Sequence, residues 1–483
     1  MKNSLIPRIA IIAVSSPLEV GAGRATQKVS ELEAVLKKEK CDVILSTAVS
    51  THRESAAAGR KLAGLFPDMV VFLPVCWFED YLVMDFIEEC RAPILLWALP
   101  GMETGSLCGC QQLGAFLKYL EHPFFHVFGE VADRKIIPQA LKYFRASALY
   151  SRLRRSKIGL CGSRVNGMTH TSPNEFMLKK ALGPRVVPVP TGKLDNLCGN
   201  PFTQELHTAD QTVGDPGNAK RLSRAPDGTR DLRRLGLKNM QKDNPVTDRD
   251  IKEIWNSFKK RCGTVNVKDE CGLESMRMYC GLRKVIAEYD LDALTVGCYP
   301  DLMGKVCAAS SLLAEEGIPM ACEGDVNGAV GQLILTLLSG EPTYNADFLE
   351  PFDNDSIIFS HCGSSSLTLA EKKSDSSLNY VRLMGQGVCV LFPAKPGKVT
   401  LLNLTPVENA YQCAILTGEA VGTEMVFPGN PARVKFDRPV KDVIDWTFEE
   451  GMGHHWMIAY GDYAEEIRAW AQIVRKNFIF KEM

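Results

Sequence analysis

The chain has 483 residues, 45% of them hydrophobic and 23% charged, and 56 basic residues against 57 acidic ones give a formal net charge of −1. These values are typical of a soluble globular protein of several domains, and they give no reason to expect nucleic acid or a membrane as a partner. The apolar run Ile9–Val14 is too short for an export signal or a membrane span. We therefore expect a cytoplasmic protein whose sixteen cysteines are reduced and mostly buried.

Residues 1–150 are expected to form an N-terminal α/β domain. Runs such as Arg8–Val14 and Met69–Leu73 predict buried strands, and helical stretches such as Lys28–Lys38 alternate with them. This alternation predicts a doubly wound parallel sheet. The first turn lacks the third glycine of a dinucleotide-binding motif, so we expect no nicotinamide cofactor. Arg24 in that turn is either a solvated side chain or a substrate contact.

Residues 151–349 predict a second doubly wound α/β domain. Its loop Gly162–Glu175 is rich in Gly, Ser, Thr and Asn, which suits a ligand with many hydroxyl groups. Met168, His170 and Asn174 are therefore candidate substrate contacts. An alternative reading is structural, because Asn174 stands where it would cap the following helix.

Residues 195–244 interrupt this second domain with few large apolar side chains and a basic portion. Such a segment cannot bury enough apolar surface to order itself, so we expect a disordered insertion. No aromatic residues are interleaved with the basic ones, which argues against a nucleic-acid-binding arm.

Residues 350–483 change character, with short strand-like runs such as Ser356–Ser360 and Ala432–Phe436 separated by turns. This pattern predicts a small, mainly antiparallel, barrel-like β domain. The stretch Tyr463–Lys476 predicts a closing helix.

The segment Met320–Asp347 is the most informative stretch of the chain. A short apolar strand ends at Glu323, and Val326–Leu338 has the composition and length of a buried helix. Asp347 follows that helix. Acids at such positions can meet on one rim of an α/β sheet, where they can hold a hard divalent ion and move protons. The simpler alternative is two solvated acids at the ends of elements.

Several motifs together carry a resemblance to a known family. They are EGDVNGA from Glu323, the spacing of 24 residues from Glu323 to Asp347, SHCG at Ser360–Gly363, HHW at His454–Trp456, GMTHTSPNEFML from Gly167 and FPGNPARVKF from Phe427. Over most of the chain outside residues 195–244, the sequence resembles the L-fucose isomerase and L-arabinose isomerase superfamily. The resemblance implies a metal-dependent aldose–ketose isomerase that forms homo-oligomers with sites at subunit boundaries.

The resemblance also implies roles for individual residues. Glu323 and Asp347 match the two carboxylates that bind the metal and act as acid and base, and His455 matches an imidazole ligand. His361 stands where the arabinose isomerases place another imidazole and the fucose isomerases do not, so its role as a ligand is open. The candidate substrate contacts are Arg24, Met168, Asn174, His454 and Trp456. For Trp456, packing in the core is an equally good explanation.

Isomerisation of an aldose to a ketose moves a proton between C1 and C2 through an enediol intermediate. The reaction needs an ion that polarises both sugar oxygens and a base beside the carbon atoms. Carboxylates combined with imidazoles suit Mn²⁺, although another divalent cation would also serve.

By this resemblance we expect the substrate to be a free sugar of the fucose or arabinose type, with a sulfonated hexose as the alternative, and the sequence does not identify the sugar further. L-Fucose, D-arabinose, L-arabinose and the sulfonated hexose sulfoquinovose are all candidates, and a sulfonate would require an Arg or Lys near the site. The competing class is a non-catalytic sugar-binding protein with two α/β lobes. That alternative predicts sugar binding without a metal and gives no role to Glu323 or His455.

Overall fold

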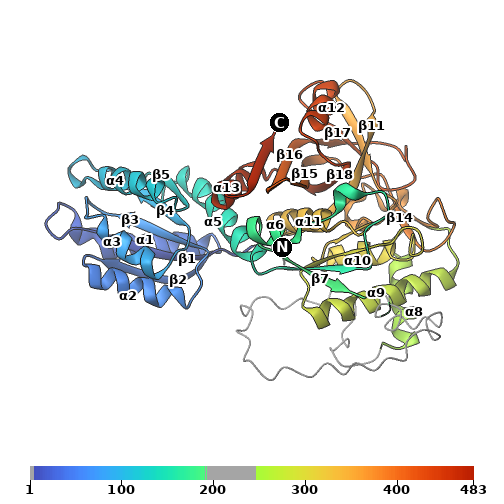
Figure 1. Ribbon diagram of the computed structural model, residues 1–483, viewed down its shortest axis with the longest axis horizontal. Helices are drawn as coiled ribbons and strands as arrows, with labels where there is room; N and C mark the ends of the chain where they lie inside the picture. The colour runs from blue at the N-terminus through green and yellow to red at the C-terminus, as the bar shows by residue number, and fades with distance from the viewer. Residues whose placement is uncertain (1–4, 191, 193–245) are drawn as a thin grey trace.

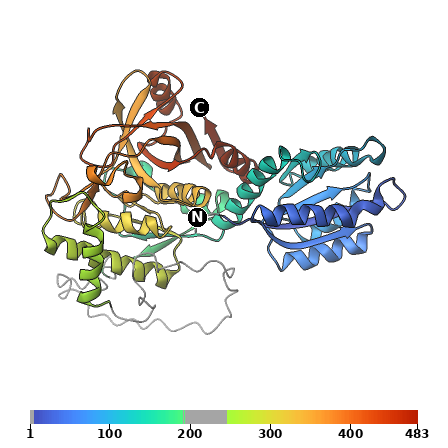
Figure 2. The ribbon, with the colours of Figure 1, turned by 180° about the vertical axis from the view of Figure 1, so that it is seen from behind.

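The computed structural model describes residues 5–190, 192 and 246–483, and the insertion expected at 195–244 lies outside the described residues. Figure 1 shows an N-terminal α/β part at one end, joined through helix α5 (Ile136–Leu153) to a second α/β part that carries the C-terminal β-rich part on top. Figure 2 shows the same arrangement from behind. Two parallel sheets followed by a mostly antiparallel sheet confirm the predicted fold class.

The first sheet is parallel, with the strand order β2-β1-β3-β4-β5. Its strands are β1 (Arg8–Val14), β2 (Asp42–Val49), β3 (Met69–Pro74), β4 (Ile94–Ala98) and β5 (Phe124–Phe128). Its helices are α1 (Ala25–Lys38), α2 (His52–Ala63), α3 (Tyr81–Glu89), α4 (Ser106–Tyr119) and α5. Every residue of β3 and β4 is buried, which explains why these strands read as continuous apolar runs rather than as alternating patterns.

The second sheet is also parallel, with the order β10-β9-β6-β7. Its strands are β6 (Lys157–Cys161), β7 (Arg185–Val189), β9 (Ala293–Val296) and β10 (Met320–Ala321). The helices of this part are α6 (Glu175–Ala181), α8 (Asp248–Lys259), α9 (Asp269–Tyr289), α10 (Cys307–Glu315) and α11 (Val326–Ser339). In the part of the chain that the structure describes, no helix is both long enough and apolar enough to span a membrane.

The C-terminal sheet has the order β15-β18-β11-β12-β17-β16-β19, and β15 also pairs with β16, so the sheet forms a near-closed ring. Its strands are β11 (Tyr344–Pro351), β12 (Ser356–Ser360), β15 (Gly397–Val407), β16 (Ala410–Val421), β17 (Ala432–Lys435), β18 (His455–Tyr460) and β19 (Phe478–Glu482). The domain limit expected between residues 349 and 350 falls inside β11. Helices α12 (Val440–Glu449) and α13 (Ala464–Val474) and a small sheet of β8 (Thr264–Val265), β13 (Ser377–Asn379) and β14 (Cys389–Leu391) complete this part.

Helix α11 joins the second sheet to the ring. All of its residues except Leu337 and Ser339 are buried, because it lies between β9 and β10 on one side and β15 and β18 on the other. Gly331 permits this close packing, since a Cβ atom there would lie 2.8 Å from the Cγ atom of Met457 on β18. The residues at the N-terminal end of α11 are therefore held firmly against the ring.

Candidate metal and catalytic site

Glu323 lies in the turn between β10 and α11, in a strained backbone conformation. Its φ is 65°, a value that costs a non-glycine residue of order 1 kcal/mol and persists only where neighbouring structure enforces it. Here the N–H of Val165 donates to the Glu323 carbonyl at 3.0 Å, and the N–H of Gly324 donates to the Val296 carbonyl at 3.0 Å. These two bonds hold the turn that carries the Glu323 side chain.

The register of the C-terminal sheet brings together Asp347, His455 and His361. Asp347 on β11 is paired with His455 on β18 and with Ser360 on β12, and His361 directly follows Ser360. Residues paired directly across antiparallel strands project from the same face of the sheet. Asp347 and His455 therefore project from one face of the ring, and His361, just beyond the end of β12, also lies near Glu323.

The distances define a compact group. The Nε2 atom of His455 lies 3.2 Å from Glu323 Oε2 and 3.5 Å from Asp347 Oδ1. The Nε2 atom of His361 lies 3.8 Å from Glu323 Oε2, and Nε2 of His454 lies 3.7 Å from Asp347 Oδ1. The carboxylates and imidazoles named by the sequence thus lie in two overlapping groups that share His455.

Asp325 is a functional candidate that sequence analysis missed, although it lies inside the EGDVNGA motif. Its Oδ1 atom accepts a hydrogen bond from the N–H of Gly328 at 2.9 Å and so caps α11, while its Oδ2 atom lies 2.8 Å from Nδ1 of His455. Because an ionised carboxylate only accepts, Nδ1 carries the hydrogen and the lone pair of a neutral imidazole lies on Nε2. A carboxylate behind an imidazole in this way is typical of metal-binding histidines.

The electrostatics of the group favour a positive charge between the carboxylates. Burial lowers the pKa of His455, but the hydrogen bond to Asp325 and the nearby Glu323 raise it more, to about 9. Burial raises the pKa of Glu323, but the imidazoles of His361 and His455 outweigh burial and hold the pKa well below its usual value. The site therefore combines an ionised carboxylate with a strong preference for a cation.

These residues fit a divalent cation. Among the described residues, Nε2 of His455 is a buried side-chain nitrogen with no aligned hydrogen-bond partner, although two carboxylate oxygens face it. One ligand atom from each of Glu323, His361 and His455 lies within 4.8 Å of the others, and the same holds for Asp347, His454 and His455. Oxygen and imidazole ligands of this kind suit Mn²⁺ and similar ions.

Three predicted substrate contacts, Trp456, Arg24 and Asn174, make other contacts in the structure. Trp456 projects from the opposite face of β18 and is 1% exposed within the apolar core, so its ring offers no surface to a sugar. The guanidinium of Arg24 donates from Nε and Nη2 to the Val75 carbonyl at 3.0 and 2.6 Å within the first domain. Asn174 caps α6 by accepting a hydrogen bond from the N–H of Met177 at 3.0 Å.

The polar loop of the second domain reaches the site through His170. Its ring centroid lies 4.9 Å from that of His454, which in turn lies 4.4 Å from that of His455. Met168 directly precedes the short 3-10 helix Thr169–Thr171 that carries His170, and its side chain is half-buried. The exposed rings of His170 and His454 thus border the buried group on its solvent side.

Arg164 is a cationic residue beside the site that the sequence analysis did not single out. It lies beside the strained turn, since a Cβ atom on Gly324 would lie 2.5 Å from the Cα atom of Arg164. Its Nη1 atom donates to the Val165 carbonyl at 3.0 Å. No sequence motif marks this residue, because its position depends on the packing of two loops.

The fold and the site define an α/β protein with a mostly buried group of acids and imidazoles whose donor atoms are close enough together to hold a metal ion. No family model matches the chain. It is 23% identical over 414 residues to the sulfoquinovose isomerase of Alkalicoccus urumqiensis, with 83% of each chain covered. It is 23% identical over 412 residues to that of Priestia megaterium (83% and 82% covered) and 24% identical over 428 residues to that of Clostridium sp. strain MSTE9 (85% of each).

The chain is thus a distant homologue of sugar isomerases over most of its length, which supports an isomerase activity. These relatives are named for a sulfonated hexose. Their names agree better with the sulfonated hexose, which the sequence analysis gave as the alternative, than with the expected sugar of the fucose or arabinose type.

Proposed function

We propose that the protein is a metal-dependent aldose–ketose isomerase that acts on a sulfonated hexose such as sulfoquinovose. The observation that carries this proposal is the convergence of two carboxylate oxygens, from elements far apart in the sequence, on the Nε2 atom of His455, which has no aligned hydrogen bond. The distant homology to sulfoquinovose isomerases supports the choice of substrate.

The residues that would hold the ion are Glu323, Asp347 and His455. When bound, a divalent ion such as Mn²⁺ polarises the C1 and C2 oxygens of the sugar. Glu323 comes from the second domain and Asp347 from the ring, so the two carboxylates border the substrate from different elements. In our proposal one of them removes the C2 proton and returns it to C1, and the other helps transfer the proton of the C2 hydroxyl to the C1 oxygen.

His170 and His454 would orient the substrate. Burial lowers the pKa of both imidazoles, and the neighbouring His455 lowers them further. A neutral imidazole offers one hydrogen-bond donor and one acceptor, which matches a sugar hydroxyl group. The two rings at the solvent side are therefore suited to a hydroxylated ligand.

Arg164 is our candidate for binding the sulfonate. A guanidinium group presents paired N–H donors to an oxyanion, and such charge-assisted bonds are strong. Its backbone lies against the turn that carries Glu323, and in the described residues its hydrogen bond to the Val165 carbonyl uses Nη1 alone. The remaining N–H groups stay available for a ligand.

Turnover of a panel of sugars tests the proposal. Protein stripped with chelator and then supplied with Mn²⁺ is expected to convert sulfoquinovose to its ketose, and Glu323→Gln is expected to lower kcat by about 100-fold or more. The control Glu350→Gln changes an exposed acid on the strand that carries Asp347 and is expected to retain activity. No turnover by folded, Mn²⁺-loaded protein would contradict the proposal. Sugar binding without metal would favour a non-catalytic protein.

Two arginine variants test the choice of sulfoquinovose as the substrate. Arg164→Gln is expected to raise KM for sulfoquinovose, while the exposed Arg53→Gln is expected to leave it unchanged. Faster turnover of L-fucose, D-arabinose or L-arabinose than of sulfoquinovose by the unaltered protein would keep the isomerase and reject the sulfonated substrate.

We also propose a homo-oligomer in which the N-terminal domain reaches the site of a neighbouring subunit. Figures 1 and 2 show this domain extending away from the ring and the second sheet, so Arg24 would serve a site in another copy rather than in its own. Sedimentation equilibrium is the direct test. A monomer at the concentrations used for turnover would contradict the proposal.

A further inference from the structure

A cluster of cysteines lies directly behind the carboxylate site. Its members come from separate elements: Cys298 follows β9, Cys322 follows β10, Cys307 begins α10, Cys362 follows β12 and Cys389 begins β14. We call these five residues the thiol cluster. Cys322 directly precedes Glu323 and Cys362 directly follows His361, so the cluster and the carboxylate site share a boundary.

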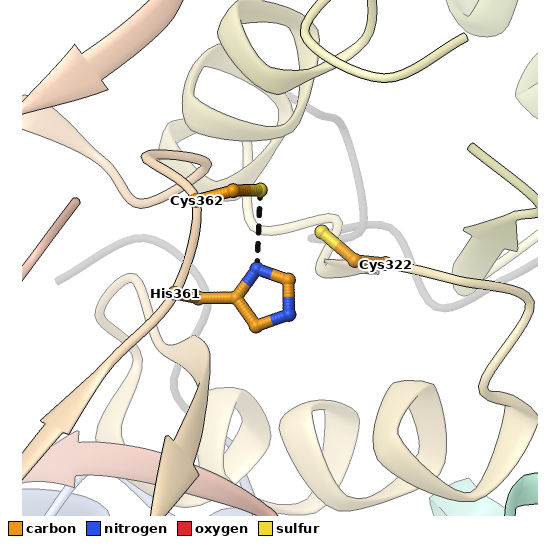
Figure 3. Close-up of side chains that lie close together, drawn as sticks. All are labelled: Cys322, His361 and Cys362. Atoms are coloured by element: carbon orange, nitrogen blue, oxygen red, sulfur yellow. Dashed lines mark hydrogen bonds between the residues drawn. The ribbon is translucent and has the colours of Figure 1, made fainter. Parts of the chain in front are cut away.

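An imidazole lies among the sulfur atoms. Nδ1 of His361 lies 3.1 Å from Sγ of Cys362, and Sγ of Cys307 lies 3.7 Å from Sγ of Cys362. One ligand atom from each of Cys322, His361 and Cys362 lies within 4.8 Å of the others. Figure 3 shows the sulfur atoms of Cys322 and Cys362 directed towards the imidazole from two separate segments of the chain.

These separations are close to those of a tetrahedral metal site. A Zn–S bond of about 2.3 Å places two sulfur ligands roughly 3.8 Å apart, and a sulfur and an imidazole nitrogen roughly 3.5 Å apart. The separation of 3.1 Å between His361 Nδ1 and Cys362 Sγ is close to the second value, and one donor atom from each of Cys322, His361 and Cys362 lies within 4.8 Å of the others. Two sulfurs with one imidazole form a soft ligand set, in contrast to the oxygen-rich set around Asp347.

Burial alone does not explain the cluster. Cys307, Cys322 and Cys389 are at most 2% exposed, and buried thiols often serve simply as small apolar side chains. His361 is different, because it is 5% exposed and directs a ring nitrogen at a sulfur atom. An imidazole between two thiols supplies the nitrogen ligand that many zinc sites combine with cysteine sulfurs.

We propose that Cys322, Cys362 and Nδ1 of His361 bind a thiophilic divalent cation of the zinc type. A neutral imidazole that binds an ion through Nδ1 carries its hydrogen on Nε2, which lies 3.8 Å from Glu323 Oε2. His361 then donates towards Glu323 and does not ligate an ion held by the carboxylates. This inference concerns a second ion and does not depend on the proposed isomerase activity.

Cobalt binding tests the proposal without any measurement of turnover. Reduced, metal-stripped full-length protein is titrated with Co²⁺ in the absence of oxygen, and the thiolate-to-cobalt charge-transfer band in the near ultraviolet is followed. We expect the band to saturate at one equivalent of cobalt. The double variant Cys322→Ser/Cys362→Ser is expected to weaken the binding that gives this band by about tenfold or more.

Matched variants separate this site from the other thiols and from the carboxylate site. Cys41→Ser/Cys413→Ser removes two buried thiols elsewhere and is expected to keep the band. Asp347→Asn alters the carboxylate site and is also expected to keep it. If the double variant does not fold, the single change at the half-buried Cys362 is used, with the same expectation. No band in the folded, unaltered protein, or an unchanged band in the folded variant, would overturn the proposal.

Discussion

Replacing Asp325 with asparagine separates the two contacts that its carboxylate makes. One oxygen accepts from the N–H of Gly328 at 2.9 Å, and the other accepts from Nδ1 of His455 at 2.8 Å. A backbone N–H only donates, so in Asp325→Asn the single remaining oxygen stays at Gly328 and the amide NH₂ faces His455. The imidazole then accepts at Nδ1 and carries its hydrogen on Nε2, the atom directed at Glu323 and Asp347.

The expected loss of Mn²⁺ affinity in Asp325→Asn follows from this exchange of tautomers. For His455 to bind an ion through Nε2 in the variant, its Nδ1–H must face the NH₂ of Asn, which leaves buried donors unpaired at a cost of about 1–3 kcal/mol. That cost corresponds to a loss of roughly tenfold to a hundredfold in Mn²⁺ affinity. The cap of α11 is retained, because asparagine caps helices about as well as aspartate.

Titration of metal-stripped protein with Mn²⁺, followed through the electron paramagnetic resonance signal of the free ion, measures this affinity. Asp325→Ala is the comparison. It also loses the cap of α11, so we expect it to be about 1 kcal/mol less stable to urea than Asp325→Asn when both are free of metal. A folded Asp325→Asn protein with unchanged Mn²⁺ affinity would refute the role of Asp325 in orienting His455.

Three further predictions concern stability. Gly331→Ala places a Cβ atom 2.8 Å from Cγ of Met457, so urea unfolding should show a loss of about 1–3 kcal/mol, and an unchanged midpoint would contradict the close packing of α11 on β18. Tyr411→Phe removes the buried hydroxyl that donates to Asn327 Oδ1 at 3.0 Å, so the free energy of unfolding should fall by about 1–3 kcal/mol. Calorimetry should therefore show a lower Tm, and an equal Tm would mean that the buried oxygen finds another donor. Thr247→Ala removes the cap of α8 at a cost of about 1 kcal/mol, whereas Thr247→Ser should retain most of that stability, so equal losses would argue against capping.

The fold could be predicted where apolar patterns are continuous. The stretch Arg8–Val14 was predicted as a strand and is β1, and Ser356–Ser360 was predicted as a strand and is β12. Strands β11 and β18 were not predicted, because Asp347 and the neighbouring histidines interrupt the apolar pattern on the face of the ring that turns towards α11. Charged groups that meet buried partners across a sheet look like loop residues in a sequence.

The candidate site could be predicted in part for a related reason. Glu323 and His455 lie in recognisable motifs, whereas the contact between Asp325 and His455 joins residues 130 positions apart and depends on how α11 docks on β18. Arg164 is near the site only through the packing of one loop on another. The thiol cluster has no spacing signature, because each of its cysteines comes from a different element.

The site is divided between the second domain and the C-terminal ring, which links ion binding to the folding of the chain. The second domain contributes Glu323, and the ring contributes Asp347 and His455, so neither part alone holds all three proposed ligands. An ion that binds only the docked arrangement stabilises docking itself, by about 2.7 kcal/mol at a concentration 100 times its Kd. During folding, therefore, ion capture should come late and report that the ring has closed onto α11. Fragments cut between the two parts should regain affinity for the ion only when they are mixed.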